Sequence, residues 1–313
     1  MSKILAIFGA TGQQGGSVIN YVLNDPELSQ RYKIRAITRD PNTEKAKQLK
    51  VEVVQGDVLN RASLKTALTG AHTVFAMTTP SFGPNGLETE YNSGKTITDV
   101  AIEEGAEYII FSTLPSAREI SGGKYTKVTP FDAKAKAEQY IRGLDIKSAF
   151  YSPGYFMENF QSQTFLAPRQ APNGTWVLAR HTSPKTKLPF IDAVGDTGKD
   201  IGKFVGAILA EPNKYEGKTF CAAAALYSWE EVAAIMSKAT GKTIVYKQIP
   251  LEDFRKSLPF EPDIFVEGFS YQDEFGYFGP DSQNLVAWAA ENARGGRLST
   301  LEEYLETHPL QLT

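Results

Sequence analysis

Cysteine and histidine are scarce in this sequence of 313 residues. The one cysteine, Cys221, rules out a disulfide within the chain and fits a reducing compartment. Its apolar neighbours predict a buried thiol rather than a nucleophile. The three histidines, His72, His181 and His308, stand far apart, with no cysteine or carboxylate at metal-ligand spacing. We therefore expect neither a disulfide scaffold nor a structural zinc site.

The sequence also lacks an excess of one charge and a long apolar run. Thirty-three basic and 36 acidic residues give a formal net charge of -3, without the basic stripe of a nucleic-acid reader or the basic cluster of an import signal. The apolar run at residues 4–8 is too short for a signal-peptide core or a membrane span. We expect no direct contact with nucleic acid or membrane, and a cytoplasmic location, with a nuclear one left open.

What the first half does contain is a regular alternation of apolar and amphipathic stretches. Strands are predicted at 4–8, 34–38, 51–55, 73–77, 108–112 and 148–151, and helices near 12–23, 43–49, 62–68, 88–104 and 131–144. Near-continuous apolar strands that alternate with helices indicate a parallel sheet covered on both faces. The predicted fold class is therefore α/β, a Rossmann-type doubly wound sheet.

The pattern becomes irregular after residue 153. Loops are predicted at 168–174 and 181–189, short strands near 219 and 244–247, and helices near 198–210, 228–240, 251–257, 280–292 and 300–306. We predict a first domain over 1–153 and a smaller mixed α/β domain over 154–313, with interleaved contributions of the chain. The second domain should pack over the carboxyl ends of the strands, where open α/β sheets bind ligands.

Three glycines follow the first strand in the segment GATGQQG, residues 9–15. Glycines permit a tight turn and a close backbone approach, and the next helix offers free N–H groups and its positive dipole end to a pyrophosphate. A strand before and a helix after make the spacing a signature of nicotinamide dinucleotide binding. The predicted contacts are Gly9, Thr11, Gly12, Gln13, Gln14 and Gly15.

The second strand ends in Thr38-Arg39-Asp40, and this place distinguishes the two nicotinamide cofactors. NAD enzymes carry an acid here that binds the ribose hydroxyls, whereas NADP enzymes need a cation for the 2′-phosphate. The planar guanidinium of Arg39 suits a phosphate. NADP(H) is therefore the favoured cofactor, and Asp40, which could itself reach a ribose, leaves NAD(H) as the alternative.

Further contacts are predicted after the third and fourth strands. Asp57 can accept a hydrogen bond from the adenine amino group while the N–H of Val58 meets the ring. The alternative is that Asp57 caps the next helix. Thr78, Thr79 and Pro80 end the fourth strand, close to where the ribose bridge should lie.

Seven segments together resemble the NmrA-like family of atypical short-chain dehydrogenases. They are GATGQQG at 9–15, TRD at 38–40, GD at 56–57, FSTL at 111–114, PFDAKAKAE at 130–138, PGYFMENF at 153–160 and FGYFG at 275–279. The resemblance covers nearly the whole chain and implies a dinucleotide-binding fold. Its known members include a fungal regulator that binds dinucleotides and a transcription factor, an NADPH-dependent redox sensor, and reductases of isoflavones and quinones.

The resemblance places Lys134 at the family's lysine, which would hold the nicotinamide ribose. Four residues earlier, where a short-chain dehydrogenase has its proton-donating tyrosine, stands Pro130. The usual proton relay is missing at this position, and we expect no replacement elsewhere. The other catalytic candidates are Ser112, placed to orient a substrate carbonyl, and Tyr155, an acid only with a cation beside it because a free tyrosine has a pKa of about 10.

Pro153, Tyr155 and Phe156 are expected to run under the nicotinamide ring. The polar segment 113–129 is expected to cover the cofactor site as a lid or a surface for a partner. Aromatic residues of the second half are candidates for the wall of a substrate pocket: Trp176, Tyr271, Phe275, Tyr277 and Phe278.

Two functions are compatible with these residues. The favoured hypothesis is a sensor of the NADP(H) state whose second half contacts a protein partner, such as a transcription factor, because the cofactor signature is intact while Pro130 replaces the proton donor. The alternative is an NADPH-dependent reductase that acts on a small-molecule substrate: a quinone, an enone or a carbonyl compound. Whether the chain is an enzyme stays open at this point.

Overall fold

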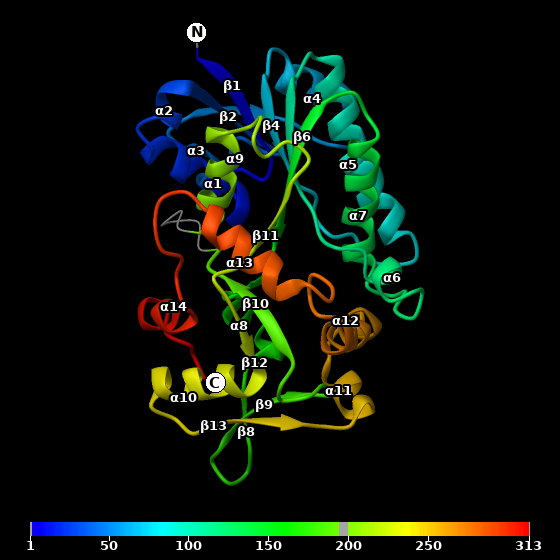
Figure 1. The fold of residues 1–313 in the computed structure, drawn as a ribbon, viewed down its shortest axis with the longest axis vertical. Helices are drawn as coiled ribbons and strands as arrows, with labels where there is room; N and C mark the ends of the chain where they lie inside the picture. Colours follow the sequence, from blue (N-terminus) through cyan, green and yellow to red (C-terminus); the bar gives the residue numbers. More distant parts are fainter. Residues whose placement is uncertain (1, 194–199, 313) are drawn as a thin grey trace.

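The computed structural model describes residues 2–193 and 200–312, which build a large parallel sheet and a smaller lobe beneath it (Figure 1). The large sheet has the strand order β11-β6-β5-β4-β1-β2-β3, and every neighbouring pair is parallel. Its strands are β1 (Lys3–Ile7), β2 (Tyr32–Thr38), β3 (Glu52–Gln55), β4 (Thr73–Ala76), β5 (Tyr108–Ser112), β6 (Lys147–Pro153) and β11 (Thr219–Ala222). The predicted doubly wound α/β fold is confirmed.

Helices cover both faces of this sheet. On one face lie α1 (Gln13–Asn24) and α9 (Asp200–Ala210), and on the other α4 (Arg61–Leu68), α5 (Gly86–Glu103) and α7 (Thr129–Arg142) (Figure 1). The short helices α2 (Leu28–Arg31) and α3 (Glu44–Lys47) flank β2. All five helices predicted in the first half are present, although the one expected over 43–49 is reduced to α3.

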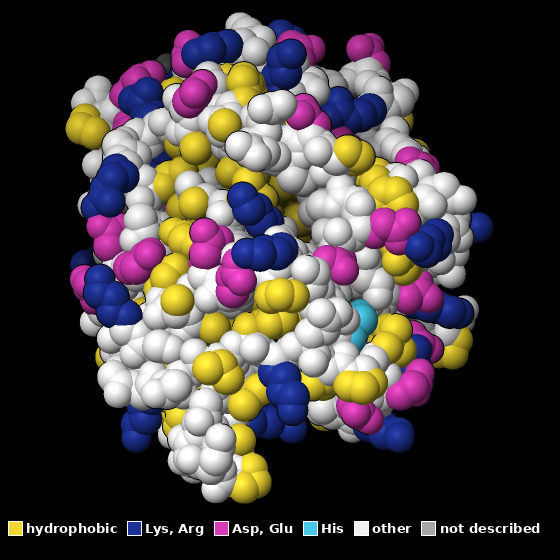
Figure 2. Space-filling view, turned by 60° about the horizontal axis from the view of Figure 1, so that its bottom comes forward, with side chains coloured by type: hydrophobic (Ala, Val, Ile, Leu, Met, Phe, Trp, Pro, Cys, Tyr) yellow, Lys and Arg dark blue, Asp and Glu magenta, His cyan; other side chains and the backbone are white. Residues whose placement is uncertain are grey.

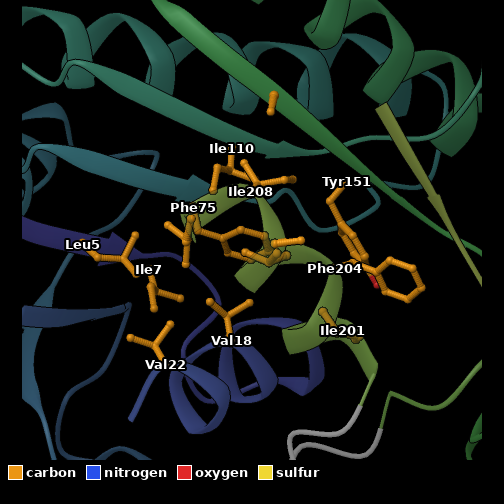
Figure 3. Packing of buried hydrophobic residues seen from close by; sticks show 14 of the residues in the cluster. Leu5, Ile7, Val18, Val22, Phe75, Ile110, Tyr151, Ile201, Phe204 and Ile208 are labelled. Atoms are coloured by element: carbon orange, nitrogen blue, oxygen red, sulfur yellow. The ribbon is translucent and has the colours of Figure 1, made fainter. Parts of the chain in front are cut away.

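The core of the α1 face shows why strands and helices fit together. Side chains from the apolar strands, such as Ile7 and Phe75, pack against Val18 of α1 and Phe204 of α9 (Figure 3). The two helices also touch directly, because α9 presents Gly202 and Gly206 to Tyr21: a Cβ at either glycine would lie 2.3 Å from an atom of that tyrosine. A helix contributed by the second half of the chain thus completes the first core.

The smaller lobe contains two three-stranded sheets, with orders β12-β10-β7 and β13-β9-β8. Their strands are β7 (Tyr155–Phe156), β8 (Arg169–Gln170), β9 (Trp176–Arg180), β10 (Lys187–Ile191), β12 (Ala225–Ser228) and β13 (Ile244–Gln248). The other elements of the lower part are α6 (Ala117–Ile120), α8 (Asn159–Ser162), the 3-10 helix Thr164–Leu166, α10 (Trp229–Thr240), α11 (Leu251–Ser257), α12 (Pro262–Phe275), α13 (Ser282–Asn292) and α14 (Leu301–Thr307). This lobe lies beneath the carboxyl ends of the large sheet (Figure 1).

Several predictions for the second half were wrong. The expected loops 168–174 and 181–189 contain β8 and the start of β10, and neither β9 nor α12 was expected. A proline has no N–H to donate within a sheet, but β7 pairs only with Phe190 and Ile191, so one side of β10 is unpaired at Pro189. Of the helix predicted over 198–210, residues 198–199 lie outside the described part.

The second half also enters the large sheet. Strand β11 pairs with β6, and α13 packs against β11 and α9. The division at residue 153 stays a prediction, but the sheet built by the first half has an edge strand that comes from much later in the chain.

Candidate functional site

A cavity of about 1050 Å³ lies at the carboxyl ends of the large sheet, between the sheet and the smaller lobe. It includes the point beside β1 where the strand order reverses direction, the usual ligand site of open α/β sheets. Most of the predicted site residues line it: Gly9, Thr11, Gly12, Gln13, Gln14, Arg39, Val58, Thr78, Thr79, Pro80, Lys134, Pro153, Tyr155 and Phe156. Gly15, Asp57 and Ser112 are not in its wall.

The glycine turn leaves no room for a side chain at its first and last glycine. Gly9 has φ +64°, and a Cβ there would lie 2.4 Å from Met77 Sδ, while a Cβ at Gly15 would lie 2.4 Å from the carbonyl oxygen of Gly9. Gly12 is the N-cap of α1 and has no side chain to cap the helix, so the first amides remain available. This geometry suits an anion held against a helix N-terminus.

Gln14 reaches the cavity with the help of a residue predicted for another role. The Ser112 hydroxyl, at the end of β5, donates to Gln14 Oε1 at 2.6 Å. Ser112 itself is fully buried and outside the cavity wall. It therefore positions Gln14, and a direct contact with a substrate carbonyl is not its role in this geometry.

Arg39 directly follows β2 and is an exposed cation at that end of the cavity. Its side chain lines the cavity, and its guanidinium has no acceptor among residues 2–193 and 200–312. Asp40 does not line the cavity, and its carboxylate accepts the N–H of Asn42 at 2.8 Å. The charge that this end of the cavity offers to a ligand is therefore positive.

Asp57 makes hydrogen bonds in the turn before α4, close to the helix-capping role that was the alternative to a contact with adenine. Its carboxylate accepts the N–H of Leu59 at 2.9 Å, and its own N–H donates to Ser63 Oγ at 3.0 Å. The cap of α4 is the neighbouring Asn60, which accepts the N–H of Ser63. Asp57 thus stabilises the turn into α4, and its contact with an adenine stays a prediction.

Lys134 lies in a buried polar cluster with a partner that sequence reasoning missed. Its ammonium donates to Thr78 Oγ1 at 3.1 Å, to the Thr78 carbonyl at 3.2 Å and to the carboxylate of Glu90. Thr78 Oγ1 in turn donates to Glu90 at 2.8 Å. Burial lowers the pKa of Lys134, and the Glu90 charge opposes this shift. The protein thus provides Lys134 with an acceptor for each of its three N–H groups.

Glu90 was detectable in principle. It lies on the same face of α5 as the buried residues Gly94, four positions later, and Ile97, three positions after that. A carboxylate on the apolar face of a helix requires a cation, since burial of an unpaired charge is costly. Lys134, four residues from Pro130 at the start of α7, is that cation.

Pro130 itself lines the cavity, where it supplies no proton. The sequence holds a Tyr-x-x-x-Lys spacing at Tyr91 and Lys95 on α5, but neither residue lines the cavity. Lys95 is instead paired with Asp99 at 2.6 Å. This spacing is therefore no replacement relay for the cavity.

The end of the cavity under the smaller lobe is rich in aromatic side chains. Phe165, Phe260 and Phe265 pack edge to face, with ring centroids 5.4–5.6 Å apart. Of the aromatic residues predicted for a pocket, Tyr277 lines the cavity, whereas Trp176, Tyr271, Phe275 and Phe278 do not. The unpredicted aromatic residues of the wall are Phe8, Phe82, Phe131, Phe165, Phe260, Phe265 and Phe269.

The segment 113–129 is tied to the helices around it. The carboxylate of Asp132 accepts the Ser116 hydroxyl at 3.1 Å and the Arg118 N–H at 3.0 Å. Tyr125 donates to Glu274 of α12 at 2.9 Å. Leu114 and Val128 line the cavity, so the segment forms part of its wall, while its role as a lid or partner surface stays a prediction.

Three features of the remaining surface and interior bear on the expectations from composition. Cys221 is buried, and burial raises the pKa of its thiol to about 12, as expected for a core residue. Basic and acidic side chains are interspersed on the face shown in Figure 2. Among residues 2–193 and 200–312, no helix is both long and apolar enough to cross a membrane.

Comparisons with known proteins agree with this architecture. The model of the NmrA-like family matches residues 1–305. An NmrA-like family domain-containing protein of Dictyostelium discoideum is 29% identical, over 98% of each chain. The NmrA-like family domain-containing oxidoreductase cpsB of Aspergillus campestris is 30% identical, over 97% of this chain and 93% of the relative.

Two solved structures show the same fold. The negative transcriptional regulator NmrA, in complex with NADP, superposes with a TM-score of 0.77 at 24% identity and covers 97% of this chain and 94% of its own. The NADPH-dependent quinone oxidoreductase QOR2 of Escherichia coli, complexed with NADPH, has a TM-score of 0.74 at 21% identity, over 97% and 99%. Because the family model matches residues 1–305, almost the full length of this chain, the chain belongs to the NmrA-like family.

Proposed function

We propose that this protein is an NADP(H)-dependent reductase of a small, uncharged acceptor with an apolar or aromatic body. The observation that carries the proposal is the extent of the cavity. It continues from the glycine turn, past Lys134, into a chamber lined by the aromatic side chains of the smaller lobe. A protein that only held a dinucleotide would have little use for such a chamber.

The residues of the cavity fit the cofactor. The glycine turn has no room for a Cβ at Gly9 or Gly15 and leaves the first amides of α1 for a pyrophosphate, and Arg39 offers a free guanidinium for a 2′-phosphate. The structures of NmrA with NADP and of QOR2 with NADPH support the same choice. When bound, NADPH supplies the hydride, and the chain must provide orientation, exclusion of water and a proton.

The chemistry of the chamber favours an uncharged acceptor. Under the smaller lobe the wall contains Phe165, Phe260 and Phe265, and its polar residues there, such as Asn159 and Gln272, are uncharged. The carboxylate of Glu90 is already neutralised by Lys134. Aromatic walls of this kind bind flat apolar molecules through ring contacts. The name of cpsB, an oxidoreductase, supports a redox reaction.

A sensor of the NADP(H) state is the second candidate, and one observation favours it. Pro130 occupies the place of the usual proton donor and lines the cavity, while the N–H groups of Lys134 are bound to Thr78 and Glu90. The regulator NmrA, whose fold this chain shares, supports this candidate. In a sensor, the reduced and oxidised cofactors must bind with different affinity, because only differential affinity shifts a conformation.

NADPH oxidation by the purified protein, followed by absorbance against quinones, enones and aldehydes, separates the two functions. For a reductase we expect turnover, and Phe260→Ala should raise KM for the acceptor while NADPH affinity stays the same. Leu59→Ala is the matched control, since Leu59 is an exposed hydrophobic residue outside the cavity. A protein that binds NADPH, reduces none of the panel, and binds NADPH and NADP⁺ with clearly different affinity would favour the sensor.

A further inference from the structure

The residues that the sequence offers to an acceptor's oxygen have no donor left for it. The Ser112 hydroxyl already donates to Gln14 at 2.6 Å, and the N–H groups of Lys134 are bound within its own buried cluster. Pro130 has no donor at all. A carbonyl oxygen gains negative charge as a hydride reaches its carbon, so a donor aimed at that oxygen lowers the barrier. The donor has to come from another part of the cavity wall.

Tyr277 brings a hydroxyl to the neighbourhood of residue 130 from far along the chain. It belongs to the motif FGYFG, residues 275–279, at the end of α12. Its ring centroid lies 5.3 Å from that of Phe131, the residue after Pro130, in an edge-to-face contact. Both rings line the cavity and pack in one apolar cluster with Leu114, which follows β5. Tyr277 therefore lies beside the two segments in which Ser112 and Pro130 were expected to serve the acceptor.

Two tyrosines of the described chain line the cavity, Tyr155 and Tyr277, and their hydroxyls differ in exposure. The Tyr155 oxygen has essentially no accessible surface, so it cannot meet a ligand. No described residue shares a hydrogen bond with the Tyr277 hydroxyl, yet this oxygen is not fully buried, and Tyr277 as a whole is 6% exposed. Burial raises the pKa of Tyr277, so the hydroxyl keeps its proton until an acceptor takes it. The wall thus contains a free O–H donor.

The turn that carries Tyr277 is held by its backbone. Gly276 has φ +80°, and a Cβ there would lie 2.7 Å from the carbonyl oxygen of Gly279, whose N–H donates to the Gly276 carbonyl at 3.2 Å. The Tyr271 hydroxyl donates to the Tyr277 carbonyl at 3.4 Å. The ring is therefore fixed at the cavity without the use of its own hydroxyl, which is left for a ligand.

We propose that the Tyr277 hydroxyl binds the carbonyl oxygen of an aromatic acceptor and gives it the proton of the reduction. This inference rests on the proposed reductase function and narrows its acceptor to aromatic carbonyl compounds. The hydride of NADPH forms a C–H bond with the carbonyl carbon, the C=O π electrons move to oxygen, and NADPH becomes NADP⁺. The O–H bond of Tyr277 breaks as its proton goes to that oxygen. Water then restores the phenol, and hydroxide returns to the solvent.

The basicity of the new oxygen makes this transfer favourable. An alkoxide is a stronger base than a phenolate, so it can take the proton of Tyr277 although burial raises the pKa of this side chain. The edge-to-face contact with Phe131 leaves the phenol in an apolar wall, where a hydrogen bond to a carbonyl is not weakened by competing water.

The carbonyl stretch of a bound ketone tests the contact without turnover. The probe is ¹³C=O-labelled acetophenone, added to the protein with NADP⁺, which has no hydride to transfer. The infrared stretch should lie at lower frequency in wild type than in Tyr277→Phe, because a hydrogen bond weakens the C=O bond. Tyr277→Phe should also weaken acetophenone binding about 3- to 10-fold. Binding of α-methylstyrene, which has CH₂ in place of the oxygen, should not change.

Turnover tests the proton. With the aldehydes of the panel, Tyr277→Phe should lower kcat about 100-fold and abolish the slowing of the reaction in D₂O, with NADPH affinity unchanged. Tyr151→Phe is the matched control, since Tyr151 of β6 is also a buried tyrosine with an unpartnered hydroxyl but lies in the core beside Phe204 and outside the cavity wall. Its substitution should change neither the stretch nor the kinetics.

The outcomes separate this inference from the function on which it rests. A carbonyl stretch that is the same in wild type and Tyr277→Phe would mean that another donor, such as the Gln272 amide in the wall, binds the oxygen, and would overturn the proposal. Equal losses of acetophenone and α-methylstyrene binding would mean that the ring only packs, with the same consequence. A lowered stretch in a protein that reduces no acceptor would refute the reductase function and leave the contact with Tyr277 established.

Discussion

Substitution of Arg39 by alanine tests the cofactor choice most directly. The guanidinium is exposed at the cavity, so its attraction to a 2′-phosphate acts in a water-like dielectric. At about 4 Å each unit of phosphate charge is then worth about 1 kcal/mol, and a phosphate of about two charges gives about 2 kcal/mol. Arg39→Ala should therefore weaken NADPH binding about 30-fold.

The assay is a calorimetric titration of wild type and variant with NADPH and with NADH. NADH lacks the 2′-phosphate, so its affinity should change less than twofold. The NADPH loss should shrink at high salt, since the charge is exposed. Lys45→Ala is the control: it removes an exposed cation close in sequence that lies outside the cavity. Equal losses for NADPH and NADH would refute the reasoning and give Arg39 a structural role.

Three further predictions concern stability. Gly15→Ala should lower the free energy of unfolding by about 1–3 kcal/mol and weaken NADPH binding, because its Cβ would lie 2.4 Å from the Gly9 carbonyl oxygen. In the control Gly16→Ala, the new Cβ has its nearest contact at an ordinary 3.6 Å, so thermal unfolding should show no loss. Glu90→Gln should cost about 3–5 kcal/mol in urea unfolding, because it strands the buried Lys134 charge. The double variant Glu90→Gln/Lys134→Met should recover part of that loss, and no recovery would mean that packing dominates. Burial raises the pKa of Glu158 to about 7 from its ordinary 4.5, so the folded state holds a proton that the unfolded chain releases between these values. Stability should therefore fall by up to about 3 kcal/mol as pH rises from 4.5 to 7, and Glu158→Gln should flatten this part of the profile. An unchanged slope in Glu158→Gln would assign the dependence to another group.

The first half of the fold could be predicted because its signals are local. Each strand is a short apolar run between helices of clear periodicity, and the glycine turn follows directly from its spacing. The second half has two- to five-residue strands whose partners lie far away in sequence, as in the pairing of β9 with β13. Such strands depend on tertiary contacts, so local patterns miss them.

The same distinction applies to the site. The glycine turn and Arg39 act through their own backbone or side chain, so their position at the cavity could be predicted from local sequence. Glu90 matters only because Lys134 packs against it. Sequence reasoning named Lys134 but had no means to pair it with a carboxylate 44 positions away on another helix.

The late arrival of β11 has a consequence for synthesis on the ribosome. Strand β6 ends at Pro153, yet its outer neighbour is complete only at Ala222. At about 5–20 residues per second, the growing chain spends roughly 3–14 s with the β6 edge unpaired. During most of that time α1 also lacks α9, which is complete only at Ala210. During that interval the nascent chain presents an open apolar strand edge, where we expect chaperone contact and aggregation to concentrate.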